Sequence, residues 1–311
     1  MQIPRLPRLI RLMAFVRIGM LQRGQILVST LQTPFTTTLK LLLHKPPWTV
    51  TLADGHKARF ESRQQLSREL ASRYFKVPTH RYEWAPAGFS GSVVITEPER
   101  GDVFAVFERE DYRWLDVAGK TVIDVGAGVG DSAVYFARRG AYKVVGFEAS
   151  AELARIAERN IQLNNVQDRV AVFACAVLPV CEDHANCLMV LRHLLDPRNP
   201  SAGPIPGPVS FNCVLEGLKD HKVALKIDCE GCEYELLQQL SDRALDPVGD
   251  VVLEFHYGFK GIKAGLEKRG YYTRTSPSHF GWNSQSSSPA MLYGYLYASR
   301  AQERLGLLNS P

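Results

Sequence analysis

Glycines and acidic residues lie together in one short segment that opens with an apolar run, Thr121-Val-Ile-Asp124-Val-Gly126-Ala127-Gly128-Val-Gly130-Asp131. The apolar run predicts a strand, and the glycines predict a turn that leads into a helix. Because glycine adopts unusual φ angles and lets another molecule approach the backbone closely, a ligand can lie against this main chain at the helix N-terminus. The segment therefore predicts a nucleotide-binding turn.

The glycine spacing bears on which nucleotide the turn accepts. A dinucleotide fingerprint, G-x-G-x-x-G counted from Gly126, needs a glycine at the position of Asp131. An acidic residue two positions before a G-x-G-x-G turn instead suits a cofactor that carries a sulfonium and an amino acid in place of a diphosphate. Asp124 is then expected near the positive amino group of that cofactor, directly or through water. The other residues of the turn that we expect at the cofactor are Gly126, Ala127, Gly128, Gly130 and Asp131.

The next predicted strand ends in a carboxylate, in the segment Val144-Val-Gly-Phe-Glu148-Ala149. A carboxylate at that position can accept hydrogen bonds from both ribose hydroxyls of a nucleoside, as the acidic residue does in dinucleotide folds. The alternative is a solvated glutamate at a strand end. Because the glycine turn precedes it, we expect Glu148 and the adjoining Ala149 to contact the cofactor.

Charged residues also end two later strands. In Val223-Ala-Leu-Lys226-Ile-Asp228-Cys-Glu230, period-two alternation places Lys226, Asp228 and Glu230 on one face. Three charges on one face of a central strand are costly unless they are paired, so they indicate a site better than a core. Glu254 and His256 alternate in the same way at the end of the presumed neighbouring strand. The candidate catalytic residues are therefore Asp228, Glu230, Glu254 and His256.

Four segments, in this order, resemble the FkbM-type methyltransferases: Ile-Asp-Val-Gly-Ala-Gly-Val-Gly, Gly-Phe-Glu, Leu-Lys-Ile-Asp-Cys-Glu-Gly-Cys-Glu-Tyr and Leu-Glu-Phe-His. The resemblance covers roughly residues 105 to 275. It implies S-adenosyl-L-methionine as the cofactor, a class I methyltransferase fold, and commonly O-methylation of a hydroxyl on a sugar or another small molecule. It also implies that Asp124, Gly126, Gly128 and Glu148 lie at the cofactor and that Asp228 and Glu230 line the site.

Methyl transfer to a hydroxyl requires that the acceptor is aligned and loses its proton. Asp228 and His256 are the candidate bases, and histidine suits the role because its unperturbed pKa is about 6.5. In the alternative, Asp228, Glu230 and Glu254 hold a Mg²⁺ ion that acidifies the hydroxyl. We favour direct proton removal without a metal.

Short apolar runs alternate with amphipathic helices from Lys120 onward. The predicted strands are 120–125, 143–148, 169–174, 223–228, 250–256, 271–275 and 291–298, and the predicted helices are 131–139, 150–163, 232–241 and 260–269. This alternation indicates right-handed βαβ units. We therefore expect a Rossmann-like α/β fold whose seven-stranded, mostly parallel sheet carries helices on both faces.

The chain is predicted to hold an accessory region and an insertion besides this sheet. The methyltransferase domain is expected over residues 119–300, before a tail at 301–311. Inside it, residues 178–221 are expected to be a surface insertion with a proline-rich centre, placed to act as a substrate lid. The accessory region, residues 48–118, is small.

Local patterns predict the elements of the accessory region. Residues 48–60 suggest a hairpin around Asp54-Gly55, and residues 62–75 suggest a helix. The apolar runs 93–95 and 103–107 suggest two further strands.

The N-terminal arm, residues 1–47, is basic. The first 53 residues contain seven Lys or Arg and no acidic residue, although the whole chain has a net charge of only +5. Such an arm could contact RNA or anionic lipid, could be a transit peptide, or could have no specific role. Two alternative functions follow: an RNA methyltransferase that uses the arm, and a non-catalytic cofactor-binding protein that docks to a membrane.

Two further features bear on the setting of the protein. No apolar run is long enough to span a membrane. Six cysteines without an apparent secretory signal favour a reducing, cytoplasmic location. The single pair Cys229 and Cys232 is too few ligands for a zinc site, and we expect it to pack in the core.

Overall fold

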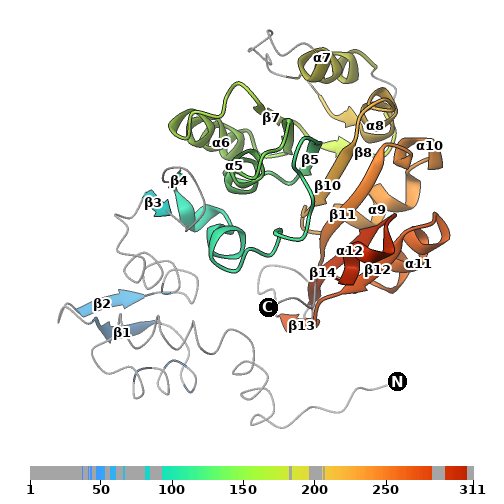
Figure 1. The fold of residues 1–311 in the computed structure, drawn as a ribbon. Coiled ribbons are helices and arrows are strands. Elements are labelled where there is room, and N and C mark those ends of the chain that lie inside the picture. Colours follow the sequence, from blue (N-terminus) through green and yellow to red (C-terminus); the bar gives the residue numbers. More distant parts are fainter. Residues whose placement is uncertain are drawn as a thin grey trace. The chain divides into compact units, whose positions relative to one another are not determined.

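The computed structural model describes residues 37, 41, 43, 47–52, 57–60, 66, 81–84, 93–181, 184–195, 205, 207–281 and 291–306. The chain divides into two compact units, residues 1–82 and residues 83–311. Figure 1 draws the second unit as a twisted sheet flanked by helices. Each unit is considered by itself.

The first unit contains the predicted hairpin. Strands β1 (Trp48–Thr51) and β2 (Lys57–Phe60) pair antiparallel, with Trp48 opposite Phe60. These two side chains and Val50 and Leu52 are buried together in a small apolar core. The prediction for residues 48–60 is confirmed. Most of the basic arm and of the helix expected over 62–75 lie outside the described residues.

The second unit is organised around one central sheet. Its strands run in the order β12-β14-β11-β10-β5-β6-β7. Their bounds are β5 Thr121–Val125, β6 Lys143–Glu148, β7 Val170–Ala174, β10 Val223–Ile227, β11 Val248–Phe255, β12 Tyr272–Thr275 and β14 Met291–Ser299. The five strands from β11 to β7 are parallel neighbours, whereas β14 is antiparallel to both β11 and β12. A short strand, β13 (His279–Gly281), also pairs with β14.

This strand order confirms the fold that the sequence predicts. The first strand, β5, lies in the middle, the chain winds outward through β6 and β7, and it then returns to build the other half from β10. The sheet is mostly parallel, with one antiparallel strand inserted near its edge, which is the class I methyltransferase fold. The predicted strands match the observed ones to within two residues at each end.

Helices cover both faces of the sheet. Helices α5 (Asp131–Arg138) and α6 (Ala151–Leu163) pack against each other, and α9 (Cys232–Gln239) packs against α11 (Lys260–Lys268). In Figure 1, α5 and α6 lie on one side of the sheet and α9 on the other. The shorter helices are α10 (Asp242–Leu245) and α12 (Gln302–Gly306). No helix of the described part of the chain is both long and apolar enough to cross a membrane.

One predicted strand is wrong. The run Val103–Phe107 was expected to be extended, but Phe104–Glu108 forms a π-helical turn. Val103, Ala105, Val106 and Phe107 are all buried. A short run that is buried on every side has no periodicity that separates strand from helix, which is why the pattern misled.

The expected insertion at 178–221 is also corrected. It contains α7 (His184–Leu195), the strand β9 (Val209–Ser210) and α8 (Phe211–Gly217), and β9 pairs with β8 (Val177–Leu178). Cys187, Val190, Phe211 and Val214 have no exposed surface and join the main core. These segments are therefore part of the domain, because their apolar faces are buried in it. Most of the proline-rich stretch that we expected as a lid lies outside the described residues.

The second unit begins well before residue 119, and two asparagines of α6 explain why. The strand β4 (Val93–Thr96), confirmed where it was predicted, is bonded to them through its backbone. Asn164 accepts from the Val94 N–H at 2.9 Å and donates to its carbonyl at 2.6 Å. Asn160 likewise accepts from the Thr96 N–H at 2.7 Å and donates to the Thr96 carbonyl at 3.2 Å. It also donates to the Val129 carbonyl at 2.8 Å. The amides thus hold β4 against α6 and the glycine turn.

Replacement of Asn160 by alanine should destabilise the protein by about 2 kcal/mol, because it leaves buried backbone groups of Thr96 and Val129 without partners. Asn160 has no exposed surface, so water cannot replace the amide. Urea unfolding followed by circular dichroism measures the change. Gln162→Ala, on the exposed side of the same helix, should change the stability by less than about 0.5 kcal/mol. Equal losses of stability in the two variants would contradict the role of Asn160 in holding β4 against α6.

The cysteines differ from the expectation for a reducing setting. The structure joins Cys187 to Cys213 and Cys229 to Cys232 as disulfides. Cys175 and Cys181 are not part of a disulfide. The Cys187 bond ties α7 to α8. Cys229 and Cys232 pack against the main core, as expected, but they are bonded to each other there.

Candidate active site

The three glycines of the turn after β5 have three different surroundings. A Cβ on Gly126 would lie 1.7 Å from the Asp228 carbonyl oxygen, and one on Gly130 would lie 2.9 Å from the Cβ of Ala157 on α6. A Cβ on Gly128 would meet nothing within 4 Å, although its φ of +53° also disfavours a side chain. Gly126 and Gly130 are therefore required by packing. Gly128 leaves open space, which is where a ligand can lie against the backbone.

This open space belongs to a cavity of about 610 Å³ at the carboxyl ends of the central strands. Eight of the twelve predicted site residues line it, namely Gly126, Gly128, Asp131, Glu148, Ala149, Asp228, Glu230 and Glu254. Four do not line it, namely Asp124, Ala127, Gly130 and His256. Ligands of open α/β sheets bind at this end of the strands. Most of the candidate site residues thus lie on the wall of one cavity.

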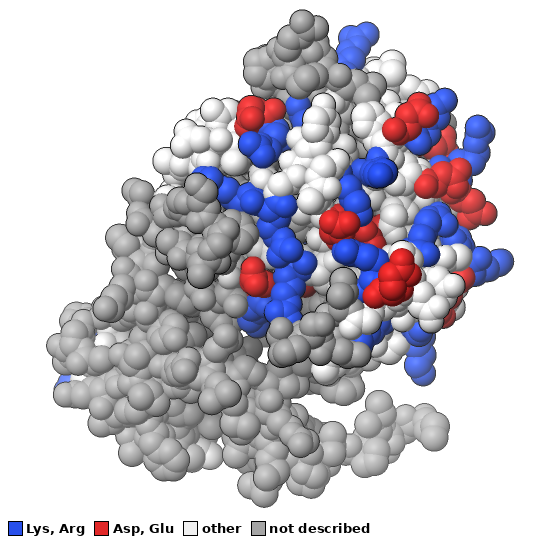
Figure 2. Space-filling view, in the orientation of Figure 1, with Lys and Arg blue, Asp and Glu red and all other residues white. Residues whose placement is uncertain are grey.

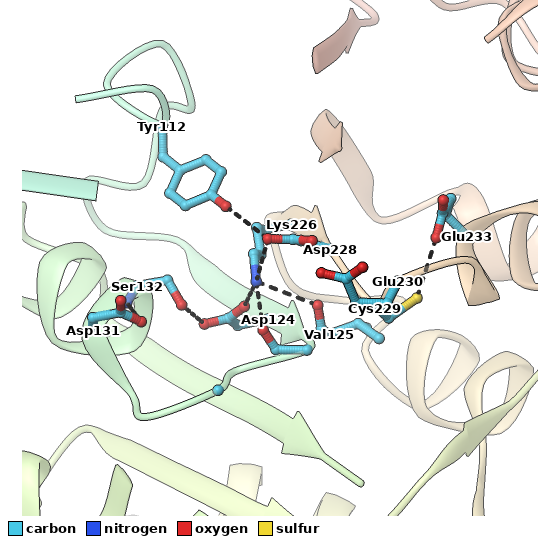
Figure 3. Close-up of polar contacts among 12 residues, drawn as sticks. Tyr112, Asp124, Val125, Asp131, Ser132, Lys226, Asp228, Cys229, Glu230 and Glu233 are labelled. Atoms are coloured by element: carbon cyan, nitrogen blue, oxygen red, sulfur yellow. Dashed lines mark hydrogen bonds and ion pairs between the residues drawn. The ribbon is translucent and has the colours of Figure 1, made fainter. Parts of the chain in front are cut away.

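Asp124 lies beneath the glycine turn, with no exposed surface. One carboxylate oxygen accepts a hydrogen bond of 2.6 Å from the Ser132 hydroxyl, and the other lies 3.0 Å from the Lys226 ammonium. Lys226 is buried as well and donates to the Gly126 carbonyl at 2.6 Å. Figure 3 shows this group between β5 and β10. Asp124 therefore holds the turn in place, and a direct contact with a cofactor stays a prediction that this geometry does not favour.

Asp131, the first residue of α5, has a carboxylate oxygen without a partner. Its Oδ1 accepts from the Ser132 backbone N–H at 2.9 Å, whereas its buried Oδ2 has no hydrogen-bond partner among the residues that the structure describes. Burial, and next the charge of Asp102, raise the pKa of Asp131 to about 7. An unpartnered buried oxygen on a cavity wall is costly for the free protein and is satisfied when a bound donor reaches it. The geometry therefore fits a cationic donor group beside Asp131.

Glu148 ends β6 and is fixed by two backbone donors. Its Oε2 accepts from the Gly128 N–H at 2.9 Å, and its Oε1 accepts from the Ser150 N–H at 2.8 Å. Each carboxylate oxygen can accept a second hydrogen bond. Glu148 is thus held facing the cavity with two acceptor positions left, as a pair of ribose hydroxyls requires.

The lining of the cavity is strongly acidic. Six carboxyl groups line it, those of Asp102, Asp131, Glu148, Asp228, Glu230 and Glu254, against two basic side chains, Arg100 and Lys226. Since Lys226 is already paired with Asp124, the wall favours a positively charged ligand and disfavours a diphosphate.

Asp228 follows the last residue of β10 and is held at the cavity wall. Its backbone N–H donates to the Val125 carbonyl at 3.0 Å, and the Tyr112 hydroxyl donates to its Oδ2 at 3.3 Å. Burial and the charge of Asp228 raise the pKa of Tyr112 well above its usual value, so the phenol stays a donor. Figure 3 shows the Tyr112 hydroxyl directed at this carboxylate. Sequence reasoning missed Tyr112, because nothing near it in sequence indicates a site.

His256 follows β11 and is held by a buried glutamate. Its Nδ1 lies 3.0 Å from Glu233 Oε1, and Glu233 has no exposed surface. The Nε2 atom lies 3.9 Å from Asp228 Oδ1 and 3.5 Å from Glu230 Oε2. Burial by itself lowers the pKa of His256, but the hydrogen bond and charge of Glu233 outweigh it and raise the pKa to about 9. The sequence indicated His256 as a candidate residue but did not indicate Glu233 as its partner.

Glu230 and Glu254 differ in their surroundings. The strand β10 ends at Ile227, so alternation does not continue to Glu230, whose φ is +58° and whose side chain is 78% exposed. The tight turn before α9 imposes this conformation. Glu254 is half-buried, and burial raises its pKa to about 8. Of the two, Glu254 is the better placed to act inside the cavity.

Comparisons with known proteins address the same segment. Residues 122–202 match the family model described as "Methyltransferase domain". A ribosomal protein L11 methyltransferase of Alteromonas mediterranea is 39% identical over 86 residues, which is 27% of this chain and 28% of that protein. A ubiquinone biosynthesis O-methyltransferase of Psychrobacter arcticus is 27% identical over 165 residues, or 50% of this chain and 62% of that protein. The chain thus spans less than two thirds of the length of either relative.

Two solved structures align with more than half of this chain. A precorrin-6y C5,15-methyltransferase of Geobacter metallireducens aligns with 58% of this chain and 82% of its own, at 15% identity and a TM-score of 0.35. A ribosomal protein L11 methylase of Lactobacillus delbrueckii subsp. bulgaricus aligns with 60% and 72%, at 18% identity and a TM-score of 0.33. The fold assignment rests on the strand order of this chain. The glycine turn and Glu148 lie within residues 122–202, the segment that matches this family model.

Proposed function

We propose that the protein is an S-adenosylmethionine-dependent methyltransferase that methylates a hydroxyl of a small molecule. The single observation that carries the proposal is the acidic cavity over the open Gly128, which Asp131 and Glu148 help to line. S-adenosylmethionine carries a sulfonium and an ammonium, which suit this lining better than the diphosphate of a dinucleotide does.

The residues of this chain have distinct roles in that proposal. Asp131 would accept from the ammonium, Glu148 would accept from the ribose hydroxyls, and Gly128 would leave room for the nucleoside against the backbone. When bound, the cofactor supplies an electrophilic methyl group. The buried pair of Asp124 and Lys226 holds the glycine turn against β10, because Lys226 contacts both Asp124 and the Gly126 carbonyl.

A hydroxyl acceptor is supported by two observations. Asp228 lines the same cavity, so that its carboxylate can take a proton from an acceptor aligned there. The relative in Psychrobacter arcticus is named an O-methyltransferase. The FkbM resemblance adds sugars to the classes of acceptor to be tested.

An RNA acceptor is the alternative, supported only by the composition of the basic arm. On the described part of the face in Figure 2, basic side chains lie interspersed with acidic ones. That mixture does not single out a nucleic-acid surface there. A screen with radiolabelled cofactor against glycan, lipid, small-phenol and RNA fractions distinguishes the acceptors.

The cofactor assignment predicts a pH-dependent affinity. Asp131, with its pKa at about 7, is anionic only above that pH. Its attraction for an ammonium should therefore grow as the pH rises from 6 to 8. We expect calorimetry to show tighter binding of S-adenosylmethionine at pH 8 than at pH 6, and Asp131→Asn should bind at least tenfold more weakly at pH 8, about 1.4 kcal/mol.

Two controls keep this measurement specific. Glu148→Gln should also weaken binding at least tenfold, but it should keep the pH dependence because Asp131 is intact. Asp242→Asn, an exposed carboxylate outside the cavity, should match the unaltered protein. Unchanged affinity in both cavity variants, or tight binding of NAD instead, would show that the assignment is wrong.

A further inference from the structure

Three side chains beside the cavity form a group with the composition of a metal site. One ligand atom each from Asp228, Glu254 and His256 lies within 4.8 Å of the other two. Asp228 and Glu254 also line the cavity. Donor atoms around a divalent ion about 2.1 Å away lie about 3 to 4 Å apart, so small side-chain rotations bring the three into contact with one ion.

The orientation of His256 is what distinguishes this group from an ordinary acidic cluster. Its ring is 95% buried, and its Nδ1 is held by Glu233 Oε1 at 3.0 Å. The His256 backbone N–H donates to that same oxygen at 3.3 Å, and the Gly231 N–H donates to the other at 2.8 Å. The other ring nitrogen, Nε2, lies 3.5 Å from Glu230 Oε2 and 3.9 Å from Asp228 Oδ1. A cation bound among these oxygens would take the place of the proton on Nε2.

A carboxylate behind a histidine is the arrangement that fixes ring and tautomer in metal sites. Here both carboxylate oxygens of Glu233 are bonded inside the fold, so it cannot serve as a ligand itself. With Glu233 on Nδ1, Nε2 is the ring atom that lies on the side of Asp228. That arrangement is unexplained by packing alone.

We propose that Asp228, Glu254 and His256 bind one divalent transition-metal cation at the acceptor end of the cavity. An imidazole beside two carboxylates favours Mn²⁺ or Zn²⁺ over Mg²⁺ and Ca²⁺, which take oxygen ligands. The sequence suggested Glu230 as a metal ligand. Because the side chain of Glu230 is mostly exposed, His256 takes its place in the proposed ligand set.

The metal site would serve the methyl transfer proposed above, so its purpose rests on that proposed function. The test of metal binding does not depend on it. Three protein ligands leave coordination positions open toward the cavity. An acceptor hydroxyl bound at one of them would lose its proton more readily, and Asp228 or solvent would take that proton. The acceptor class is then a molecule whose hydroxyl oxygen can enter a metal coordination sphere.

The test is metal binding to the full-length chain, after treatment with a chelator and without cofactor. Free Mn²⁺ is measured by electron paramagnetic resonance during a titration. We expect one site per chain, with Mg²⁺ at least tenfold weaker. His256→Gln and Glu254→Gln should each weaken Mn²⁺ binding at least tenfold, and Glu233→Gln should weaken it by about ten- to a hundredfold by freeing the ring.

Matched variants and a second probe keep the result falsifiable. Asp242→Asn, an exposed carboxylate outside the cavity, should change Mn²⁺ affinity less than threefold. Bound Co²⁺ should give a visible spectrum that changes in His256→Gln, which reports a nitrogen ligand directly. The absence of a site, or equal Mn²⁺ affinity in His256→Gln and the unaltered chain, would overturn the proposal. Calorimetry with S-adenosylmethionine on the same samples tests the proposed function separately, since Asp131 and Glu148 lie outside the metal group.

Discussion

Replacement of Asp124 by asparagine should destabilise the fold by about 3 to 5 kcal/mol, the scale for removing one partner of a buried ion pair. Asparagine keeps the size of the side chain and can still accept a hydrogen bond from Ser132. What it removes is the charge beside Lys226, whose ammonium lies 3.0 Å away and whose side chain is only 2% exposed. The variant therefore isolates the electrostatic contribution of Asp124.

The charge state of Lys226 supports this expectation. Burial by itself lowers the pKa of Lys226, but the charges of Asp124 and Asp228 outweigh it and raise the pKa above its ordinary value. The ammonium is thus charged at neutral pH and depends on Asp124 for compensation. Asp228 Oδ2, 4.0 Å away, is too distant to replace it fully.

Urea unfolding with a constant m-value measures the loss. Asp242→Asn breaks an exposed ion pair with Arg269 and is the matched control, with an expected change within about 1 kcal/mol. The double variant Asp124→Asn with Lys226→Met removes both charges and should recover part of the stability. A loss below about 1 kcal/mol in Asp124→Asn would mean that Lys226 finds another partner or water in this site.

The sequence pattern was sufficient to predict the fold and the end of the sheet where the cavity lies. Strands, helices and the order of the βαβ units follow from apolar runs and helical periodicity, which are local properties. The cavity wall follows from the same pattern, since Glu148, Asp228 and Glu254 stand at the carboxyl ends of parallel strands. These predictions depend on local periodicity and on the rule that the carboxyl ends of parallel strands meet at one edge of the sheet. Neither requires information about contacts between distant residues.

The pairing of charges was beyond that pattern. Asp124 and Lys226 were both identified, yet their contact is between register partners on neighbouring strands. An aspartate in the strand just before a glycine turn looks the same in sequence whether it contacts a ligand or a buried lysine. Its burial decides between the two, and burial depends on the whole sheet.

Contacts from outside the βαβ pattern were missed for a related reason. Tyr112 reaches Asp228 from 116 positions away, and Asn160 reaches Thr96 from 64 positions away. A tyrosine in an irregular segment and an asparagine on an amphipathic helix have no spacing that marks them. Glu233 was hidden similarly, as an acidic residue in the first turn of a helix, where such residues are common.

Replacement of Asp228 by asparagine should lower the rate of methyl transfer at least a hundredfold while S-adenosylmethionine binding stays within about threefold. Loss of a positioned base usually costs about two to four orders of magnitude. The substitution keeps the side-chain shape and its hydrogen bond from Tyr112, so the cavity should keep its form. Cofactor binding should persist because Asp131 and Glu148, which we propose as its ligands, belong to other elements.

The measurement is the turnover number with an acceptor identified by the screen, at saturating cofactor and with Mn²⁺ present or absent. Tyr112→Phe is the comparison that separates the carboxylate from its support: it removes only a 3.3 Å hydrogen bond to Asp228, so its rate should fall about tenfold or less. If Asp228 removes the proton directly, the loss in Asp228→Asn is the same with and without metal. If it acts as a metal ligand, high Mn²⁺ should restore part of the rate, since Glu254 and His256 remain. Near-normal turnover in both Asp228→Asn and His256→Gln would mean that the protein only aligns the acceptor, and that proton removal does not occur at these residues.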